Sequence, residues 1–345
     1  MISRRALMLA AVPGSVLPPA AIRFPRDHGS HPQFRTEWWY ITGRLTSGAR
    51  EFGFQVTFFR TRVDPAQPMS SRFAAKQIVF AHAAITDVQG QRLWHDQRIA
   101  REGFDVATAG TQDLQVKLCD WSLVRDASDT LVARIIAADF SLDLRCKPTQ
   151  PVLLQGKQGL SRKGPLAQQA SYYYSEPQLE VGGTLALRGE RLQAAGRAWL
   201  DHEWSEEVLD PNAVGWDWIG MNMDDGSALT AFRLRNTDGS TLWDGGSFRP
   251  RGGDAYIFSR GEVEFRPQRR WTSPVSAARY PVEWIVRTPS DFYTVRAVLD
   301  NQELDSRAST GTIYWEGLSR LVDSNGKQVG SGYLEMTGYA QRLRI

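Results

Sequence analysis

The densest cluster of titratable side chains in this 345-residue chain is Asp201-His202-Glu203, which lies between Trp199 and Trp204. Alternate residues of a β-strand point to opposite faces. Asp201 and Glu203 should therefore share one face with Trp199, while His202 shares the other face with Trp204. A carboxyl group among aromatic rings has its charged form disfavoured, so it can stay protonated near neutral pH. Such a group can protonate an alkene, and water can then capture the resulting cation.

This chemistry gives each residue of the cluster a predicted role. We predict Asp201 as the proton donor, with Glu203 as the second choice, and His202 as the group that orients water or acts as a base. A purely structural interpretation of these residues remains open as well. Asp201 and Glu203 also suit a solvated strand face or structural partners of arginine residues.

Further candidate site residues are aromatic or titratable side chains in strand-like surroundings. Aromatic faces can stabilise a cation and line an apolar pocket. The predicted ligand-binding residues are Trp204, Trp216, Trp218, Tyr173, His82, Glu37, Trp39 and Trp315. His82, between two alanines, also suits a core histidine, and Glu37 suits an anchor that holds the first strand by binding backbone N–H groups. Glu316 and Glu335, in Tyr- and Trp-rich strands, receive the same structural interpretation.

The sequence contains no motif for a serine nucleophile, a metal site or a phosphate-binding loop. The chain has no G-x-S-x-G elbow, no HExxH motif and no CxxC pair, and its five histidines are dispersed. The Gly-rich basic segment 156–165 lacks the spacing of a phosphate-binding loop. We therefore expect no metal and no cofactor, and acid–base addition, elimination or cyclisation fits better than hydrolysis by a nucleophile.

The elements that must position these residues are predicted to be antiparallel strands. Apolar residues alternate with polar ones over many short runs, such as Leu114-Gln-Val116-Lys-Leu118. Asp238-Gly239 and Asn325-Gly326 supply the positive backbone angles that tight hairpins need. Long amphipathic helices are hard to find. The chain is predicted to be all-β, and closure into barrels would remove exposed sheet edges.

Two tryptophan-rich segments resemble each other and indicate a tandem arrangement. Glu37-Trp-Trp-Tyr-Ile-Thr-Gly43 and Trp216-Asp-Trp-Ile-Gly220 each precede a polar turn and an alternating strand. A length of 345 residues accommodates two domains, each with its own core. Similar β-rich units in one chain favour a repeated fold whose use is to hold an apolar ligand.

The first residues are predicted to direct export. Residues 1–21 have a charged start with Arg4-Arg5, a short apolar stretch and a small-residue end, which is typical of a signal peptide. The arginine pair also fits the twin-arginine export route as one alternative. We therefore expect a periplasmic or secreted protein. The net charge is +3, and these two arginines lie in the leader, so the rest is close to neutral and gives no electrostatic argument for nucleic acid. Whether Cys119 and Cys146 pair is left open.

Segments spread over residues 28–345 together resemble the AttH/CrtC family of lipocalin-like proteins. They are His31-Pro-Gln-Phe-Arg-Thr-Glu-Trp-Trp-Tyr40, Ala81-His-Ala-Ala-Ile-Thr-Asp87, Gly159-Leu-Ser-Arg-Lys-Gly164, Ala170-Ser-Tyr-Tyr-Tyr-Ser175, Gly196-Arg-Ala-Trp-Leu-Asp-His-Glu-Trp204, Tyr314-Trp-Glu-Gly317 and Gly332-Tyr-Leu-Glu-Met-Thr-Gly-Tyr339. The resemblance implies two tandem lipocalin-like (calycin) antiparallel β-barrels packed side by side. Relatives include carotenoid 1,2-hydratases, other hydratases or cyclases of secondary metabolites, and an exported group called predicted secreted hydrolases.

These observations predict the division of the chain and three competing functions. The N-terminal lipocalin-like domain is expected at 22–185 and the C-terminal one at 186–345. The first hypothesis is an exported protein that binds an isoprenoid or lipid-like molecule and hydrates or cyclises it. The second is a non-catalytic carrier of such a molecule that serves a membrane transporter. The third is an interaction module whose aromatic residues pack together and leave no cavity. A carboxyl group that points into an enclosed apolar cavity would favour the first.

Overall fold

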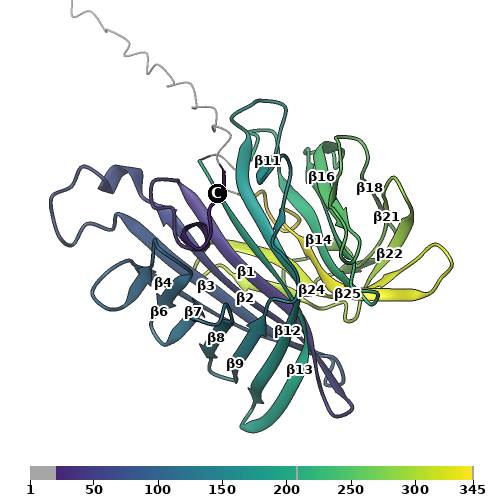
Figure 1. Ribbon diagram of the computed structural model, residues 1–345, viewed down its shortest axis with the longest axis horizontal. Coiled ribbons are helices and arrows are strands. Elements are labelled where there is room, and N and C mark those ends of the chain that lie inside the picture. The colour runs from purple at the N-terminus through teal and green to yellow at the C-terminus, as the bar shows by residue number, and fades with distance from the viewer. Residues whose placement is uncertain (1–20, 207–208, 344–345) are drawn as a thin grey trace, which may run out of the picture.

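The computed structural model describes residues 21–206 and 209–343 and confirms the all-β prediction. Two large antiparallel sheets lie side by side, as Figure 1 shows. Two short 3-10 helices, η1 (Arg26–His28) and η2 (Asp64–Ala66), accompany them. No helix in this described part of the chain has the length and apolar character that a membrane span requires.

The first sheet has thirteen strands and curls into a nearly closed barrel. It contains β1 (Thr36–Ser47), β2 (Arg50–Arg62), β3 (Gln77–Asp87), β4 (Arg92–Arg101), β5 (Ala107–Ala109), β6 (Gln115–Leu118), β7 (Trp121–Arg125), β8 (Leu131–Ile136), β9 (Phe140–Lys147), β10 (Leu153–Leu154), β11 (Leu160–Arg162), β12 (Ala170–Leu187) and β13 (Glu190–Ser205). The strand order is β4-β3-β2-β1-β13-β12-β9-β8-β7-β6-β5, and β5 and β6 return to approach β3.

The second sheet has ten strands in the order β17-β16-β15-β14-β25-β24-β22-β21-β18, with β23 paired to β24. It contains β14 (Gly215–Met223), β15 (Ala228–Arg235), β16 (Thr241–Arg249), β17 (Tyr256–Ile257), β18 (Glu264–Pro267), β21 (Glu283–Arg287), β22 (Phe292–Ala297), β23 (Glu303–Ser306), β24 (Thr312–Val322) and β25 (Gln328–Met336). A separate hairpin is formed by β19 (Arg270–Thr272) and β20 (Arg279–Pro281).

The tryptophan-rich segments occupy equivalent places in the two sheets. β1 lies between β2 and β13, and β14 lies between β15 and β25, so each opens its unit and pairs with the second and the last long strand. β12 and β13 both belong to the first sheet. The chain therefore passes to the second sheet between Ser205 and Gly215, beyond the predicted division at 185 and 186.

The two sheets pack through a shared aromatic cluster. Tyr40 and Trp199 of the first sheet meet Trp218 and Tyr333 of the second in one buried apolar group. Gly53 of β2 lies so close to the second sheet that a Cβ atom there would fall 2.6 Å from the Tyr333 hydroxyl. The absence of a side chain at this position therefore permits the close approach of the sheets.

Each sheet also has its own apolar core, built by alternation. In β9, for example, the buried residues Phe140, Leu142, Leu144 and Cys146 alternate with more exposed ones. The sulfur of Cys146 is a free thiol in this core, and Cys119 is a free thiol at the surface. Strand segments that face both the barrel and the other sheet lose this alternation. The last eight residues of β13, 198–205, are all buried.

The segment before β1 is held against the first barrel by a buried ionic network. The carboxylate of Glu37 accepts hydrogen bonds from the backbone N–H of His31 and from Arg60 Nε, at 2.8 and 2.9 Å. Arg60 also donates to the carbonyls of His31 and Phe34. The predicted anchoring role of Glu37 through a backbone N–H group agrees with this geometry. Arg60 is 1% exposed, so its charge depends on the carboxylate.

We predict that Glu37→Gln destabilises the protein by about 3–5 kcal/mol, because it leaves the buried Arg60 guanidinium without a counter-charge. The matched control is Glu190→Gln, which breaks an exposed ion pair with Arg50 and should leave the free energy of unfolding nearly unchanged. Denaturant unfolding of the two variants and the wild type measures both effects. Equal, small losses in both variants would show that the network does not hold the barrel together.

Candidate functional site

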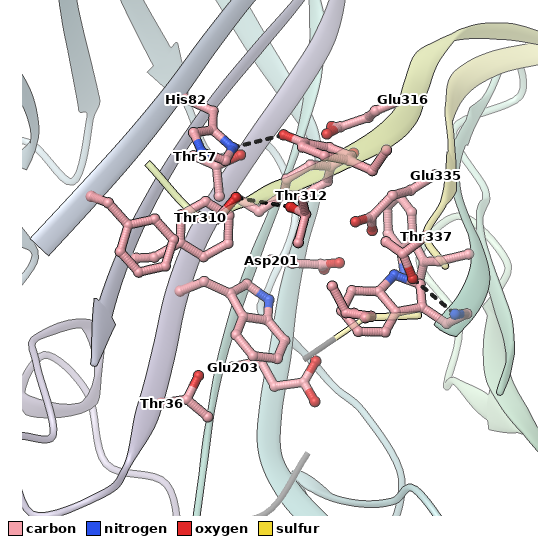
Figure 2. Close-up of a pocket in the computed structure, with 18 of the residues that line it drawn as sticks. Thr36, Thr57, His82, Asp201, Glu203, Thr310, Thr312, Glu316, Glu335 and Thr337 are labelled. Atoms are coloured by element: carbon pink, nitrogen blue, oxygen red, sulfur yellow. Dashed lines mark hydrogen bonds between the residues drawn. The ribbon is translucent and has the colours of Figure 1, made fainter. Parts of the chain in front are cut away.

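A cavity of about 380 Å³ lies between the two sheets and not inside either core. Strands of the first sheet form one wall and strands of the second sheet form the other. Figure 2 shows carboxyl groups that point from both sheets toward the same space. The lining residues are Thr36, Trp38, Tyr40, Thr57, Phe59, Thr61, Ile78, Phe80, His82, Ile99, Lys163, Tyr173, Asp201, Glu203, Leu209, Trp216, Trp218, Phe232, Leu234, Ser309, Thr310, Thr312, Tyr314, Glu316, Glu335, Thr337 and Leu343.

Alternation along the long strands decides which side chains reach the cavity. Asp201 and Glu203 of β13 face it, as predicted, and so do Trp38 and Tyr40 of the neighbouring β1. The residues between them point into the first barrel. The cavity wall is therefore the outer face of a barrel whose inner face is filled by apolar core.

Asp201 is buried and accepts three hydrogen bonds from neutral donors. Tyr173 Oη donates to Oδ2 at 2.7 Å, and Ser175 Oγ and Trp199 Nε1 donate to Oδ1 at 2.6 and 2.7 Å. Burial raises the pKa of Asp201 to about 7, although these donors lower it in part and the nearby Glu203 raises it further. The carboxyl group therefore titrates near neutral pH.

Glu316 and Glu335 form a second acidic centre on the opposite wall. They are direct cross-strand partners on β24 and β25, so two carboxyl groups face each other. Burial raises the pKa of Glu316 well above its usual range, and the Glu335 charge adds to the rise. Burial also raises the pKa of Glu335 to about 7, with further contributions from Asp201 and Glu203. Neither glutamate is in an ion pair among the described residues, so at least one of them holds a proton near neutral pH.

Glu203 has a different environment, since a cation lies beside it. Lys163 Nζ is 3.0 Å from Glu203 Oε1, and both side chains are buried. The ammonium group also lies over the rings of Tyr173 and Phe232, at 4.7 and 4.3 Å from their centroids. Glu203 thus has a cationic partner, whereas the hydrogen-bond donors to Asp201 are all neutral.

Aromatic rings from both sheets surround these carboxyl groups. Trp218 Nε1 donates to Tyr173 Oη at 3.2 Å, which links the second sheet to the hydroxyl that binds Asp201. The Trp218 ring also packs edge-on against Tyr40 and Trp199. Trp216 lies in the same wall. The predicted residues Tyr173, Trp216 and Trp218 thus come together around the acidic groups, although they come from distant parts of the chain.

His82 lines the cavity at another point, on β3. Its Nδ1 lies 2.9 Å from Tyr314 Oη and its Nε2 lies 2.9 Å from Ser309 Oγ. Burial lowers the pKa of His82 to about 3, so the ring is neutral at physiological pH. His82 therefore adds no charge to the cavity, and both of its nitrogens already have hydrogen-bond partners.

Five predicted site residues are not among those that line the cavity. Trp39, Glu37, His202 and Trp204 point into the first barrel, because they occupy the alternate positions of β1 and β13. His202 lies on the strand face opposite Asp201, as alternation predicts, and its predicted role of orienting water or acting as a base stays a prediction. Trp315 belongs to the apolar core of the second sheet, where its Nε1 donates to the Asp300 carbonyl at 2.7 Å.

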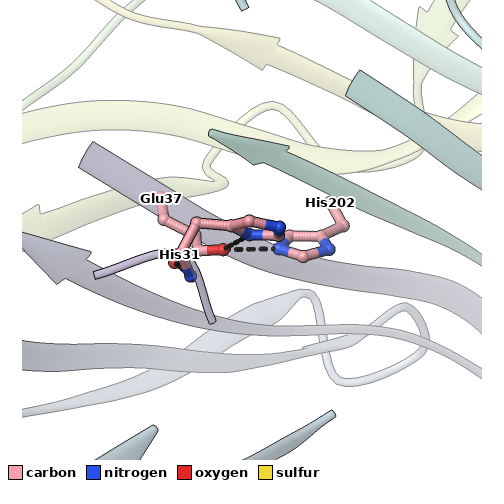
Figure 3. Close-up of side chains that lie close together, drawn as sticks. All are labelled: His31, Glu37 and His202. Atoms are coloured by element: carbon pink, nitrogen blue, oxygen red, sulfur yellow. Dashed lines mark hydrogen bonds and ion pairs between the residues drawn. The ribbon is translucent and has the colours of Figure 1, made fainter. Parts of the chain in front are cut away.

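The side chains of His31, Glu37 and His202 meet closely enough to hold a metal ion, as Figure 3 shows. His31 Nδ1 and His202 Nε2 lie 2.7 and 2.9 Å from the same oxygen, Glu37 Oε1. The other oxygen binds Arg60, whose positive charge opposes a cation at this place. Burial opposes ionisation of Glu37, but the bonds from His202 and His31 outweigh it and hold the pKa of Glu37 below its usual range. The group therefore suits an internal hydrogen-bond network better than a metal site.

The sequence interpretation missed the acidic pair as a site feature. Glu316 and Glu335 were assigned structural roles, yet both point into the cavity. A signal was present, because each lies within two residues of a tyrosine or tryptophan and has no arginine beside it. Their direct pairing depends on the register of β24 and β25, which alternation within one strand does not reveal.

Comparison with solved structures places this architecture among known folds. The chain is similar to a putative AttH from Nitrosomonas europaea, with 47% identity, a TM-score of 0.88, and coverage of 94% of this chain and 99% of the other. It is also similar in fold to kievitone hydratase from Nectria haematococca, with 14% identity, a TM-score of 0.73, and coverage of 94% of both chains. CghA has the same identity and coverage, with a TM-score of 0.55.

No curated protein sequence matches the chain. The family comparison is nevertheless decisive, because the AttH-like profile matches residues 15–339, which is nearly the whole chain. The cavity between the sheets, with its carboxyl groups and aromatic walls, is thus a feature of a protein that belongs to the AttH-like family.

Proposed function

We propose that this protein is a hydratase-type catalyst that adds water to a carbon–carbon double bond of an apolar molecule held between the two sheets. The observation that carries the proposal is the pair of buried carboxyl groups, Asp201 and Glu335, whose pKa values both lie at about 7 in one aromatic cavity. Membership of the AttH-like family and the fold shared with kievitone hydratase support the same reaction type.

The protonation states of Asp201 and Glu335 suit acid–base catalysis. The charge of Asp201 raises the pKa of Glu335, so ionisation of the first group disfavours ionisation of the second. Near neutral pH the two groups then share protons, with one serving as the acid and the other as the base. Asp201 remains our choice as the acid. Three neutral donors hold its carboxyl group in a single orientation.

The proposed reaction is a stepwise addition. The protonated carboxyl group of Asp201 gives its proton to one alkene carbon, which leaves a carboxylate and a carbocation. The rings of Trp218, Trp216 and Tyr173 are placed to stabilise that cation. A water molecule adds to the cation through its oxygen, and the ionised Glu335 accepts the proton that this water releases. One water is added in total, and no other reagent is consumed.

The ligand class follows from the cavity walls. A cavity of about 380 Å³ lies in the range that holds small molecules, and its apolar lining suits an unsaturated isoprenoid or lipid-like body. Threonine hydroxyls that line the cavity can bind a polar substituent. An exported, periplasmic or secreted location is part of the proposal, although the predicted leader falls almost entirely on residues 1–20, outside the described residues. A carrier that serves a membrane transporter is the alternative.

We predict that Asp201→Asn lowers the hydration rate by about 100-fold or more, because the amide cannot supply the proton. The protein is purified from its own host, and the molecules it retains are identified by native mass spectrometry and after extraction. Incubation of these molecules with the wild type in isotopically labelled water should increase their mass by one water, and the variant should bind them unchanged. The control Asp143→Asn, at an exposed position on β9, should behave as the wild type.

The same experiment distinguishes the two candidate functions. If the wild type and Asp201→Asn both return the same unmodified molecule, the protein is a carrier and the catalytic proposal fails. A rate that is unchanged in Asp201→Asn but lost in Glu335→Gln would assign the acid to the second wall instead.

We also predict a pH signature in the stability of the fold. An aspartate has a pKa of about 4 in an unfolded chain, and burial raises that of Asp201 to about 7. The folded state thus holds this proton more tightly, so the carboxyl group costs stability progressively as the pH rises from about 4 to about 7. Asp201→Asn lacks this cost. Relative to the wild type, it should gain a few kcal/mol between pH 4 and pH 8 in denaturant unfolding.

The control for this measurement is again Asp143→Asn, whose difference from the wild type should stay constant with pH. Parallel stability curves for Asp201→Asn and the wild type would show that folding does not raise the pKa of Asp201, so that it is ionised near neutral pH. In that case it could not act as the acid near neutral pH.

A further inference from the structure

An exposed aromatic and basic cluster lies at one end of the first sheet. Phe73, in the loop between β2 and β3, is 65% exposed, and Phe104, in the loop after β4, is 44% exposed. Their rings stack with centroids 5.5 Å apart and planes 11° apart. Arg72 and Arg101 lie over both rings, with Arg101 4.0 Å from the Phe104 centroid. We call these four residues the Phe–Arg cluster.

The backbone holds Phe104 in a conformation that bulky residues rarely adopt. Its φ is +59°, as is that of the next residue, Asp105. A positive φ is costly for a side chain of this size and persists where the surrounding structure enforces it. Arg101 Nη1 also donates to the Phe73 carbonyl at 2.8 Å, which ties the two loops together. Both phenylalanines are therefore presented to solvent by an ordered arrangement.

The positive charges of the cluster have no carboxylate partner in the part of the chain that the structure describes. Neither Arg72 nor Arg101 forms an ion pair with a carboxylate in residues 21–206 and 209–343. Guanidinium groups bind phosphate oxygens in a bidentate manner. Exposed aromatic rings beside cationic side chains suit the boundary between the head groups and the acyl chains of a bilayer.

The cluster adjoins the cavity along one face of two strands. Ile78 of β3 and Ile99 of β4 line the cavity, and Arg101 is the cross-strand partner of Ile78 and lies two residues after Ile99. Residues two apart on a strand share a face. Arg101 therefore lies on the same strand face as the cavity-lining isoleucines, between them and the two phenylalanines. Ile99 is itself 48% exposed, and Ile78 and Ile99 form a short apolar track between the cavity and Arg101.

We propose that the Phe–Arg cluster docks the protein on a lipid bilayer with anionic head groups, with Phe73 and Phe104 inserted and Arg72 and Arg101 on lipid phosphates. Docking places the apolar track against the bilayer, so that a hydrophobic ligand passes into the cavity without crossing water. This second statement rests on the proposed function, whereas the docking itself does not.

Co-sedimentation with vesicles tests the docking. The wild type is mixed with vesicles of phosphatidylcholine alone and of phosphatidylcholine with phosphatidylglycerol. It should sediment with the anionic vesicles, and less so as salt is added. Phe73→Ser with Phe104→Asn should lower the partition coefficient at least about tenfold, because the apolar insertion is lost. Asparagine is used at 104 because it tolerates a positive φ. Arg72→Gln with Arg101→Gln should lower it more than about fivefold, on anionic vesicles only.

Two controls keep the test specific. Phe292→Ser removes a comparably exposed phenylalanine from the second sheet and should leave sedimentation unchanged. Thermal unfolding checks that each variant is folded. Asp201→Asn should bind vesicles as the wild type does, so a failure of the catalytic proposal leaves this result intact. The docking proposal is overturned if the wild type stays in the supernatant with both vesicle types. It is equally overturned if the Phe73/Phe104 variant sediments as the wild type does, or if Phe292→Ser loses as much binding.

Discussion

The structure depends on strands that are buried on both faces. β1 and β13 each send one set of side chains into the first barrel and the alternate set into the space between the sheets. A strand with a two-residue period can therefore contribute side chains to the barrel interior and to the cavity between the sheets at once. Glu37 and His202 belong to the first set, and Tyr40 and Asp201 belong to the second. Without the second sheet, the cavity face would be an exposed outer wall.

Burial alone does not decide whether an acidic group is protonated. Three of the buried carboxyl groups in this protein have pKa values that differ in each case. Glu37 receives hydrogen bonds from Arg60 and histidine rings and is held ionised. Asp201 receives only neutral donors, which offset part of the desolvation, so it titrates near neutral pH. Glu316 faces another carboxyl group and is held neutral. The desolvation penalty is common to all three, and the partners set the difference.

The tandem arrangement builds the cavity from both halves of the chain. The second sheet repeats the strand order around β14, but its apolar core is filled, and it contributes Trp218, Glu316 and Glu335 to the shared cavity. Each wall supplies acidic groups and aromatic rings. A ligand between the walls would therefore contact residues that lie more than a hundred positions apart in the chain, and the packing of the sheets sets the geometry of the site.

The sequence by itself determined the class of fold, the tandem repeat, and the sharing of one strand face by Asp201 and Glu203. Those features depend on alternation and turn residues, which act over a few positions. Family-specific segments spread along the chain added the lipocalin-like architecture. Tyr173, Trp216 and Trp218 were predicted to line a pocket because they are aromatic. Their spacing in the sequence did not indicate that they lie together.

The tertiary structure alone decided which face of each strand is enclosed. Alternation separates His202 from Asp201, yet it does not say which of the two strand faces lines a cavity. The predicted site residues His202, Trp39 and Trp204 therefore do not line this one. The pairing of Glu316 with Glu335 and the inclusion of β13 in the first sheet arise from long-range register and sheet packing. These contacts join residues that are far apart in the sequence, so local patterns do not predict them. Burial between two sheets arises only when the whole chain has folded.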